Sequence, residues 1–241
     1  MLALLLSLAA APSAVAPSAP PPVAVVPAID LDSLKSGPYR PDALAFAQAT
    51  MPEKPFNDML SAMIDRGFRE GLGEGAATLE EASPGILQEL QASIHAATAS
   101  MRAGAYRDTM ERYARLYSQA LTPVETAELT QFYRTPTGQK LIAAKYASTV
   151  TGSVALDRDT TAQDVTQLNR AAVNSALGKM EGDDMVELMK FGTLPSFRKL
   201  KALTATVNKL EVLMANEEHP EAEQAVADAV SAVMKRRGLA D

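Results

Sequence analysis

Apolar residues recur at intervals of three and four along most of the chain after residue 55. This spacing places them on one face of an α-helix, because the helix repeats every 3.6 residues. Well-defined stripes run from Phe56 to Leu72 and from Phe197 to Met214, with others of the same period between and after them. Only the stretch from Ser153 to Leu156 is a weak strand candidate. The pattern therefore predicts an all-α protein of about eight helices.

Two Thr-Pro pairs divide the middle of the chain, at Thr122-Pro123 and at Thr135-Pro136. Threonine is a favoured N-cap and proline suits the first helical position, so each pair predicts a helix start. Glu125 follows Thr122 at the spacing of a capping box. Two successive helices that meet at Pro136 form what we call a helix–Pro–helix corner.

A second corner is predicted 59 residues further on. Sliding the chain by 59 aligns residues 121–141 with residues 180–200, and six of the 21 positions are identical, among them Phe132 with Phe191 and Pro136 with Pro195. At two aligned positions an aromatic residue and a glycine are exchanged, since Tyr133 aligns with Gly192 and Gly138 aligns with Phe197. One aromatic ring would then fill the same space from either side of the Pro-initiated turn, which would conserve core volume. We interpret this as a degenerate duplication that gives two weakly related helix–Pro–helix halves, against two unrelated corners.

The first corner resembles the TxxE and FYxSPxGQK segments of a bacterial exported family catalogued as domain of unknown function two-zero-five-nine. The residues that carry the resemblance are Thr122 to Glu125, then Phe132, Tyr133, Thr135, Pro136, Gly138, Gln139 and Lys140. The similarity extends over about residues 54 to 157. It implies an all-helical, exported protein, and it supplies no activity and no functional residue.

The N-terminal region is typical of an exported protein. An apolar run from Leu2 to Ala11 is followed by small residues and prolines, which indicates a signal peptide within residues 1–25. The run is too short to span a membrane, which takes about twenty apolar residues. We therefore expect a periplasmic or secreted protein with no transmembrane span once the signal is removed; a plain Ala/Pro leader is the alternative.

We divide the rest of the chain into three parts. A Pro-rich tether is expected at residues 26–41 and a helical domain at 42–157. We expect residues 158–241 to form a helical C-terminal half that carries the degenerate repeat of the first corner.

Composition excludes several classes of protein. The net charge of −6 and pI near 5.1 argue against a nucleic-acid partner, which requires a basic footprint. Zero cysteines exclude disulfides, thiolate catalysis and a lipid anchor on cysteine. The only histidines, His95 and His219, are too few for a multi-histidine metal site. We expect no cofactor and no metal.

The motif search finds no catalytic constellation. The glycines from Gly71 to Gly75 follow no strand and read as a helix terminator. No serine lies in a nucleophile elbow. The sequence therefore favours a non-enzymatic interaction or structural module of the bacterial envelope, whose partner is an envelope protein.

The polar residues of the first corner are the only candidates for ligand binding. Tyr133, Arg134, Gln139 and Lys140 combine a phenol, an amide and two cations that could hold a carboxylate or a phosphate. Each also has a plain structural interpretation, as a helix cap or a core residue. The alternative function is thus a binding protein for a small amphipathic or anionic ligand held between the helical halves.

Overall fold

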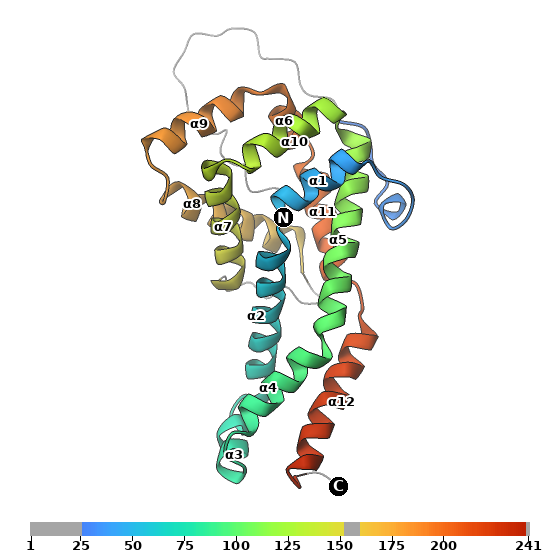
Figure 1. The fold of residues 1–241 in the computed structure, drawn as a ribbon, viewed down its shortest axis with the longest axis vertical. Helices are drawn as coiled ribbons and strands as arrows, with labels where there is room; N and C mark the ends of the chain where they lie inside the picture. Colours follow the sequence, from blue (N-terminus) through green and yellow to red (C-terminus); the bar gives the residue numbers. More distant parts are fainter. Residues whose placement is uncertain (1–25, 152–159, 240–241) are drawn as a thin grey trace. The chain divides into compact units, whose positions relative to one another are not determined.

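The computed structural model describes residues 26–151 and 160–239. Within these ranges the chain forms twelve α-helices, one short 3-10 turn and no strand (Figure 1). The all-α prediction is confirmed, whereas the expected number of about eight helices is too low. The strand candidate at 153–156 lies outside the described residues. The elements are η2 (Asp32–Leu34), α1 (Pro41–Thr50), α2 (Glu53–Leu72), α3 (Gly75–Ala82), α4 (Ile86–Ala97), α5 (Ala99–Ala120), α6 (Pro123–Tyr133), α7 (Pro136–Thr151), α8 (Ala162–Leu177), α9 (Gly182–Thr193), α10 (Pro195–Ala202), α11 (Thr204–Ala215) and α12 (Pro220–Arg236).

The extra helices arise where a continuous apolar stripe hides a break. The stripe from Phe197 to Met214 is two helices, because α10 ends at Ala202 and α11 begins at Thr204. Leu203, between them, is fully buried. A buried apolar residue at a helix junction keeps the period intact, so hydrophobic spacing alone does not reveal the junction.

The segment expected to be a tether is anchored over its second half. Leu34 is fully buried. The Arg115 guanidinium donates to the carbonyl oxygens of Gly37 at 2.8 Å and of Leu34 at 3.1 Å, and it lies over the Tyr39 ring. Proline content predicts a tether at residues 26–41, but it does not reveal this anchoring, because Arg115 lies far away in sequence.

The chain divides into two compact units. Unit 1 combines the described residues up to Pro52 with Thr109–Glu217, and unit 2 combines Glu53–Asp108 with the described residues from Glu218 onward. The division does not fall at residue 157, where the sequence suggested a boundary. The corners and the repeat alignment belong to unit 1.

An uninterrupted series of aromatic rings forms much of the core of unit 1. Tyr113, Tyr117 and Phe46 are each fully buried. Neighbouring centroids in the series lie between 3.6 and 5.9 Å apart. The series runs through Tyr113, Tyr117, Phe46, Tyr133, Phe132, Phe191 and Phe197.

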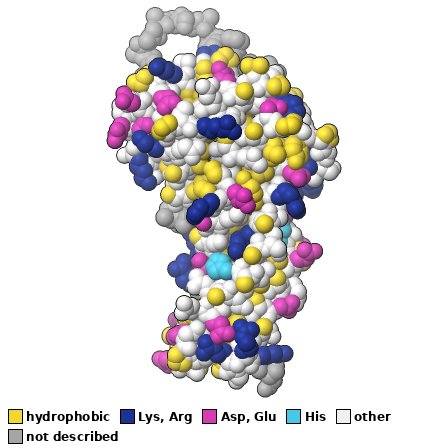
Figure 2. All heavy atoms as spheres, in the orientation of Figure 1, with side chains coloured by type: hydrophobic (Ala, Val, Ile, Leu, Met, Phe, Trp, Pro, Cys, Tyr) yellow, Lys and Arg dark blue, Asp and Glu magenta, His cyan; other side chains and the backbone are white. Residues whose placement is uncertain are grey.

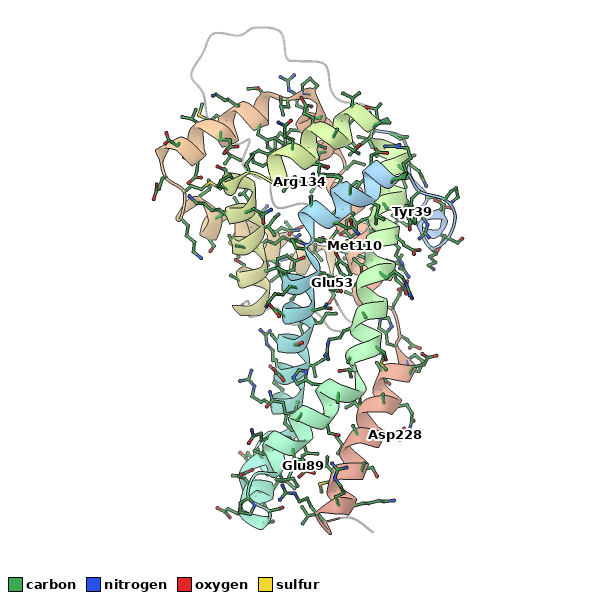
Figure 3. The ribbon with its side chains drawn as sticks, viewed as in Figure 1. Tyr39, Glu53, Glu89, Met110, Arg134 and Asp228 are labelled. Atoms are coloured by element: carbon green, nitrogen blue, oxygen red, sulfur yellow. The ribbon has the colours of Figure 1, made fainter. Side chains whose placement is uncertain are left out.

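Unit 2 is held by α4 against α12. Ile86, Leu90 and Val233 are buried at this contact. Glu89 on α4, labelled in Figure 3, accepts from Arg236 at 2.9 Å and from Arg237 at 2.7 Å. Arg236 and Arg237 at the end of α12 thus neutralise a carboxylate of the same unit. Elsewhere charges of both signs are interspersed over the visible surface (Figure 2).

The glycines after α2 end that helix, as predicted. Gly73 has φ +48°, a left-handed conformation that glycine adopts without steric cost, and its N–H donates to the Arg69 carbonyl. No strand precedes the turn, and α3 begins directly at Gly75. The segment is therefore a helix terminator rather than a phosphate loop.

Gly138 is required where α6 and α7 meet. A Cβ at Gly138 would lie 2.4 Å from the Phe132 carbonyl oxygen and 2.7 Å from Tyr133 Cα. Both obstacles are backbone atoms, so no change of side-chain rotamer can relieve the overlap. Gly192, in the first helix of the second corner, is different, because a Cβ there would meet nothing within 4 Å.

These two glycines provide a matched test of the corner. Gly138→Ala is expected to lower the free energy of unfolding by about 1–3 kcal/mol, because the methyl group forces α6 and α7 apart. Gly192→Ala is expected to leave it unchanged or raise it slightly, since alanine is favoured over glycine in helices by roughly 0.5–1 kcal/mol. Urea unfolding of both variants measures the difference. Equal effects at the two positions would contradict the close approach at Gly138.

Candidate functional site

Two helix–Pro–helix corners in unit 1 pack against each other. The first is α6 followed by α7, and the second is α9 followed by α10. Pro136 and Pro195 each start the second helix of their corner, as predicted. The contacts are crossed, because α6 packs on α10 and α7 packs on α9.

The N-caps of the two corners are built alike. Thr122 accepts from the N–H of Glu125 at 3.3 Å, and the Glu125 carboxylate accepts from the N–H of Thr122 at 2.7 Å, which completes the predicted capping box. Glu181 and Asp184 occupy the capping-box positions at the start of α9, where the Asp184 carboxylate accepts from the N–H of Glu181 at 2.9 Å. The two boxes are 59 residues apart.

One pair of phenylalanines lies at the centre of the contact. The rings of Phe132 and Phe191 stack with centroids 3.6 Å apart and 8° between their planes. Phe132 is 7% exposed and Phe191 is 2% exposed, so both rings are buried. These two residues are aligned with each other by the 59-residue offset, so each corner contributes its aligned phenylalanine to the stack.

The polar contacts around the rings also occur in pairs. Lys140 Nζ lies 2.6 Å from Asp184 Oδ2, and Lys199 Nζ lies 3.0 Å from Glu125 Oε2. Lys140 aligns with Lys199, and Glu125 aligns with Asp184. Each ion pair therefore joins the lysine of one corner to the acidic residue of the other. An approximate two-fold relation between the corners would produce this exchange.

Hydroxyl contacts repeat the same exchange. Thr137 donates to the Glu187 carboxylate, and Ser196 donates to the Glu128 carboxylate. Thr137 aligns with Ser196, and Glu128 aligns with Glu187. Both hydroxyl residues are at most 2% exposed, so these are buried donors with satisfied partners.

Asp184 is the most perturbed carboxylate at this contact. The hydrogen bond from Lys140 lowers the pKa of Asp184 to about 2, helped by the N–H of Glu181 and the Thr137 hydroxyl. The same bond raises the pKa of Lys140. For Glu125, burial alone would raise the pKa, but bonds from the Thr122 N–H and from Lys199 outweigh burial and lower it. Both ion pairs are therefore charged at neutral pH.

The four predicted binding residues do not converge on one space. Tyr133 is buried in the aromatic core, while Gln139 Nε2 donates to the Tyr133 carbonyl at 2.6 Å. Lys140 pairs with Asp184, and Arg134 is exposed at the corner between α6 and α7 (Figure 3). Three of the four thus have contacts that stabilise the corner, and ligand binding by them stays a prediction.

The proposed exchange of aromatic rings between the corners is wrong. Phe197 does not fill a space beside Gly192, because a Cβ there would meet nothing within 4 Å. Gly138 is needed for the backbone of Phe132 and Tyr133 rather than for the Tyr133 side chain. Phe197 instead packs on Phe191 at 4.8 Å.

The outer faces of α6 and α9 differ sharply. On α6, Thr126 is fully buried and Thr130 is 8% exposed, and α1 packs on this helix. On α9, three apolar residues are exposed: Met185 by 37%, Val186 by 52% and Met189 by 70%. Sequence reasoning missed this face. The repeat alignment contained an indication of it, because it pairs the polar residues Thr126 and Thr130 with the apolar residues Met185 and Met189.

A separate hollow of about 450 Å³ lies in unit 2, among α2, α3 and α4. Phe68, Leu72 and Leu87 supply apolar lining, and Asp65 and Arg69 supply charge. Asp65 is fixed by Gln91 at 2.7 Å and by His95 at 2.6 Å. Burial would raise the pKa of Asp65, but these two bonds outweigh it and lower the pKa. His95 thus orients a carboxylate at this hollow.

Signs of catalytic chemistry are sparse in the described part of the chain. Within residues 26–151 and 160–239, no group of three or more His, Asp or Glu side chains could hold a metal ion. Burial lowers the pKa of Lys145 on α7 well below its usual value. A nucleophilic amine must also reach its substrate, and Lys145 is only 6% exposed.

Comparison with known proteins gives one match. Residues 108–156 match the model of a family described as "Uncharacterized protein conserved in bacteria (DUF2059)", which is the family that the first corner resembles. No curated protein and no solved structure matches the chain. Among the helices that the structure describes, none combines the length and apolarity needed to cross a membrane.

A double-mutant cycle tests whether the two corners depend on the stacked rings. Phe132→Ala and Phe191→Ala are each expected to cost about 3–5 kcal/mol of unfolding free energy, because each leaves a cavity at a buried site. The double variant is expected to cost less than the sum by about 0.5–1.5 kcal/mol, since the second change removes a ring whose partner is already gone. Urea unfolding supplies the four free energies. The Phe→Leu cycle serves if the alanine variants do not fold, and strict additivity in both cycles would show that the rings are not coupled.

Proposed function

We propose that this protein is a non-enzymatic interaction module of the bacterial envelope, built from two related halves that pair corner to corner. The observation that carries the proposal is the exposed apolar face of α9, which we define as Met185, Val186 and Met189. Single exposed apolar residues are ordinary on protein surfaces. Three within five residues of one helix, two of them one turn apart, call for an explanation.

Several independent features support the two related halves. The paired ion pairs, the paired hydroxyl contacts and the two capping boxes all keep the offset of 59 residues. Unrelated corners would have no reason to share it. The sequence identity alone was modest, and these contacts add an argument from geometry.

The chemistry of the α9 face suits binding to another macromolecule. Methionine is unbranched and polarizable, so its side chain adapts to the partner's shape. Val186 adds a rigid branched surface beside the two methionines. No catalytic group is among these residues, which favours interaction over reaction.

An envelope location agrees with the N-terminal sequence and with the bacterial family. The apolar run at residues 2–11 followed by prolines is typical of a signal peptide. Residues 108–156 match a family described as conserved in bacteria. The compartment we propose is the periplasm or the medium.

A second candidate function is the binding of a small amphipathic ligand. The hollow in unit 2 favours it, because apolar side chains there adjoin the fixed carboxylate of Asp65 and the cation of Arg69. This hollow belongs to unit 2, whereas the four polar residues of the first corner that suggested a ligand belong to unit 1. The α9 face remains the stronger argument, since its three apolar side chains are exposed.

Export is tested by the mass of the protein made in its own cells. We expect a mature chain that begins between about residues 10 and 25 and is released by osmotic shock, because the apolar run is followed by small residues. Intact-mass spectrometry of the released protein measures the start. A cytoplasmic chain that begins at Met1 would contradict export.

Interaction through α9 is tested by photo-cross-linking in living cells. A photoreactive phenylalanine analogue in place of Met189 is expected to give a discrete product of higher mass. The matched control is the same analogue in place of Val124, which is 78% exposed on α6 and lies outside the α9 face. Adding Met185→Ser should weaken the product at 189 by removing apolar contact. Equal products from both positions, or none, would count against the proposal.

A further inference from the structure

We propose that α9 receives one amphipathic α-helix of a partner protein, seated as α1 is seated on α6. The inference rests on the proposed function and specifies the shape and chemistry of the partner. It follows from comparing α6 and α9 position by position and asking why one is covered and the other is open.

Burial on the two helices agrees closely apart from one face. Leu129 and its counterpart Leu188 are buried, as are Phe132 and Phe191. The pronounced differences fall at three aligned positions, which are Thr126, Thr130 and Tyr133 on α6 and Met185, Met189 and Gly192 on α9. The three are buried on α6, whereas on α9 the methionines are exposed and the glycine is half-buried.

Helix α1 accounts for the burial on α6. Thr126 Oγ1 donates to Asp42 Oδ2 at 2.5 Å, and the Phe46 ring lies 5.9 Å from the Tyr133 ring. The buried residues of α1, which are Ala43, Phe46, Ala47 and Thr50, follow the i, i+3, i+4, i+7 spacing of one helical face. The positions of Met185, Met189 and Gly192 on α9 are therefore the ones that hold a helix on α6.

The residues of α9 specify a complementary stripe. Met185 and Met189 are longer than the threonines they replace, so the docked helix needs small residues opposite them, as α1 has at Ala43 and Ala47. A Cβ on Gly192 would meet nothing within 4 Å, which leaves room for a bulky side chain from the partner. An alanine-rich stripe with one aromatic residue fits these demands.

Charge at the start of α9 specifies the orientation. On the first half, Arg40 directly precedes α1 and donates to the carbonyl oxygens of Ser118 at 2.6 Å and of Leu121 at 2.8 Å. At the corresponding end of the second half, Glu181 and Asp183 are exposed carboxylates. Of the two exposed cations nearby, Lys140 already pairs with Asp184 and only Lys179 adds to it. A partner helix that begins with arginine or lysine would be attracted to this end.

Other occupants fit the face less well. Helix α1 of this chain already covers α6. A second copy of α9 would set methionine against methionine and leave the space over Gly192 empty. A helix from a partner protein can supply both the small residues opposite the methionines and the bulky side chain over Gly192.

The probe for this mode of binding is a labelled synthetic peptide with the sequence of residues 38–52, which contains Arg40 and all of α1. Added to the full-length protein, it is expected to bind, and fluorescence anisotropy measures the Kd. Met189→Lys should raise the Kd at least about tenfold, because it places a charge in the centre of the apolar face. The matched control Val124→Lys should change it by less than about twofold, since that position lies outside the face.

A variant that makes α9 resemble α6 tests the comparison directly. This variant carries Met185→Thr, Met189→Thr and Gly192→Tyr. The changes place on α9 a hydroxyl that can bind Asp42 of the peptide and a ring that can pack on its Phe46, as Thr126 and Tyr133 do on α6. This variant should bind the peptide about tenfold more tightly than the natural protein. The gain should disappear with a peptide that carries Phe46→Ala.

The outcomes separate the inference from the proposed function. No peptide binding, or binding that Met189→Lys leaves unchanged because the peptide displaces the resident α1, would overturn the helix-docking mode. Self-association of the protein that Met189→Lys abolishes would assign the face to a second copy and also overturn it. A cross-linked product from position 189 together with absent peptide binding would retain the interaction role and reject the helix. Peptide binding without any cross-linked product in cells would uphold the geometry and reject the interaction role.

Discussion

The stacking of Phe132 on Phe191 is the contact on which the architecture of unit 1 depends. Each ring belongs to the first helix of its corner, and the stack joins the aromatic core on one side to Phe197 on the other. Because both rings are buried, any shift of one corner against the other would separate them and open a cavity. The ion pairs and hydroxyl contacts at the edges then fix the rotation of the corners, since charged hydrogen bonds are directional.

Much of the fold could be predicted from the sequence, and the parts that could depended on local physics. The capping box at Thr122 and the proline starts at Pro136 and Pro195 involve neighbouring residues only, and all are as expected. The break at Leu203 and the anchoring of residues 34–40 by Arg115 depend on tertiary contacts. Apolar period and proline content carry no information about such contacts.

The candidate site was harder to predict because exposure is a property of the whole fold. Lys140 looks like a free cation in the sequence, yet its partner Asp184 is 44 residues away. Met185 and Met189 are apolar and give no sign of exposure in the sequence, yet within residues 26–151 and 160–239 no helix covers them as α1 covers α6. The repeat alignment was the one sequence signal that related these positions to each other.

Carrying both corners on one chain has a consequence for stoichiometry. A dimer of identical subunits would display its equivalent faces twice, and a partner with two binding helices could then link dimers into chains. Here α1 covers one of the two faces, so by the docking proposed above the molecule would bind a partner helix only at the other. A molecule with a single docking face would end an assembly rather than extend it. The pairing of the two corners with each other also does not weaken on dilution, because one chain keeps them at a high effective concentration.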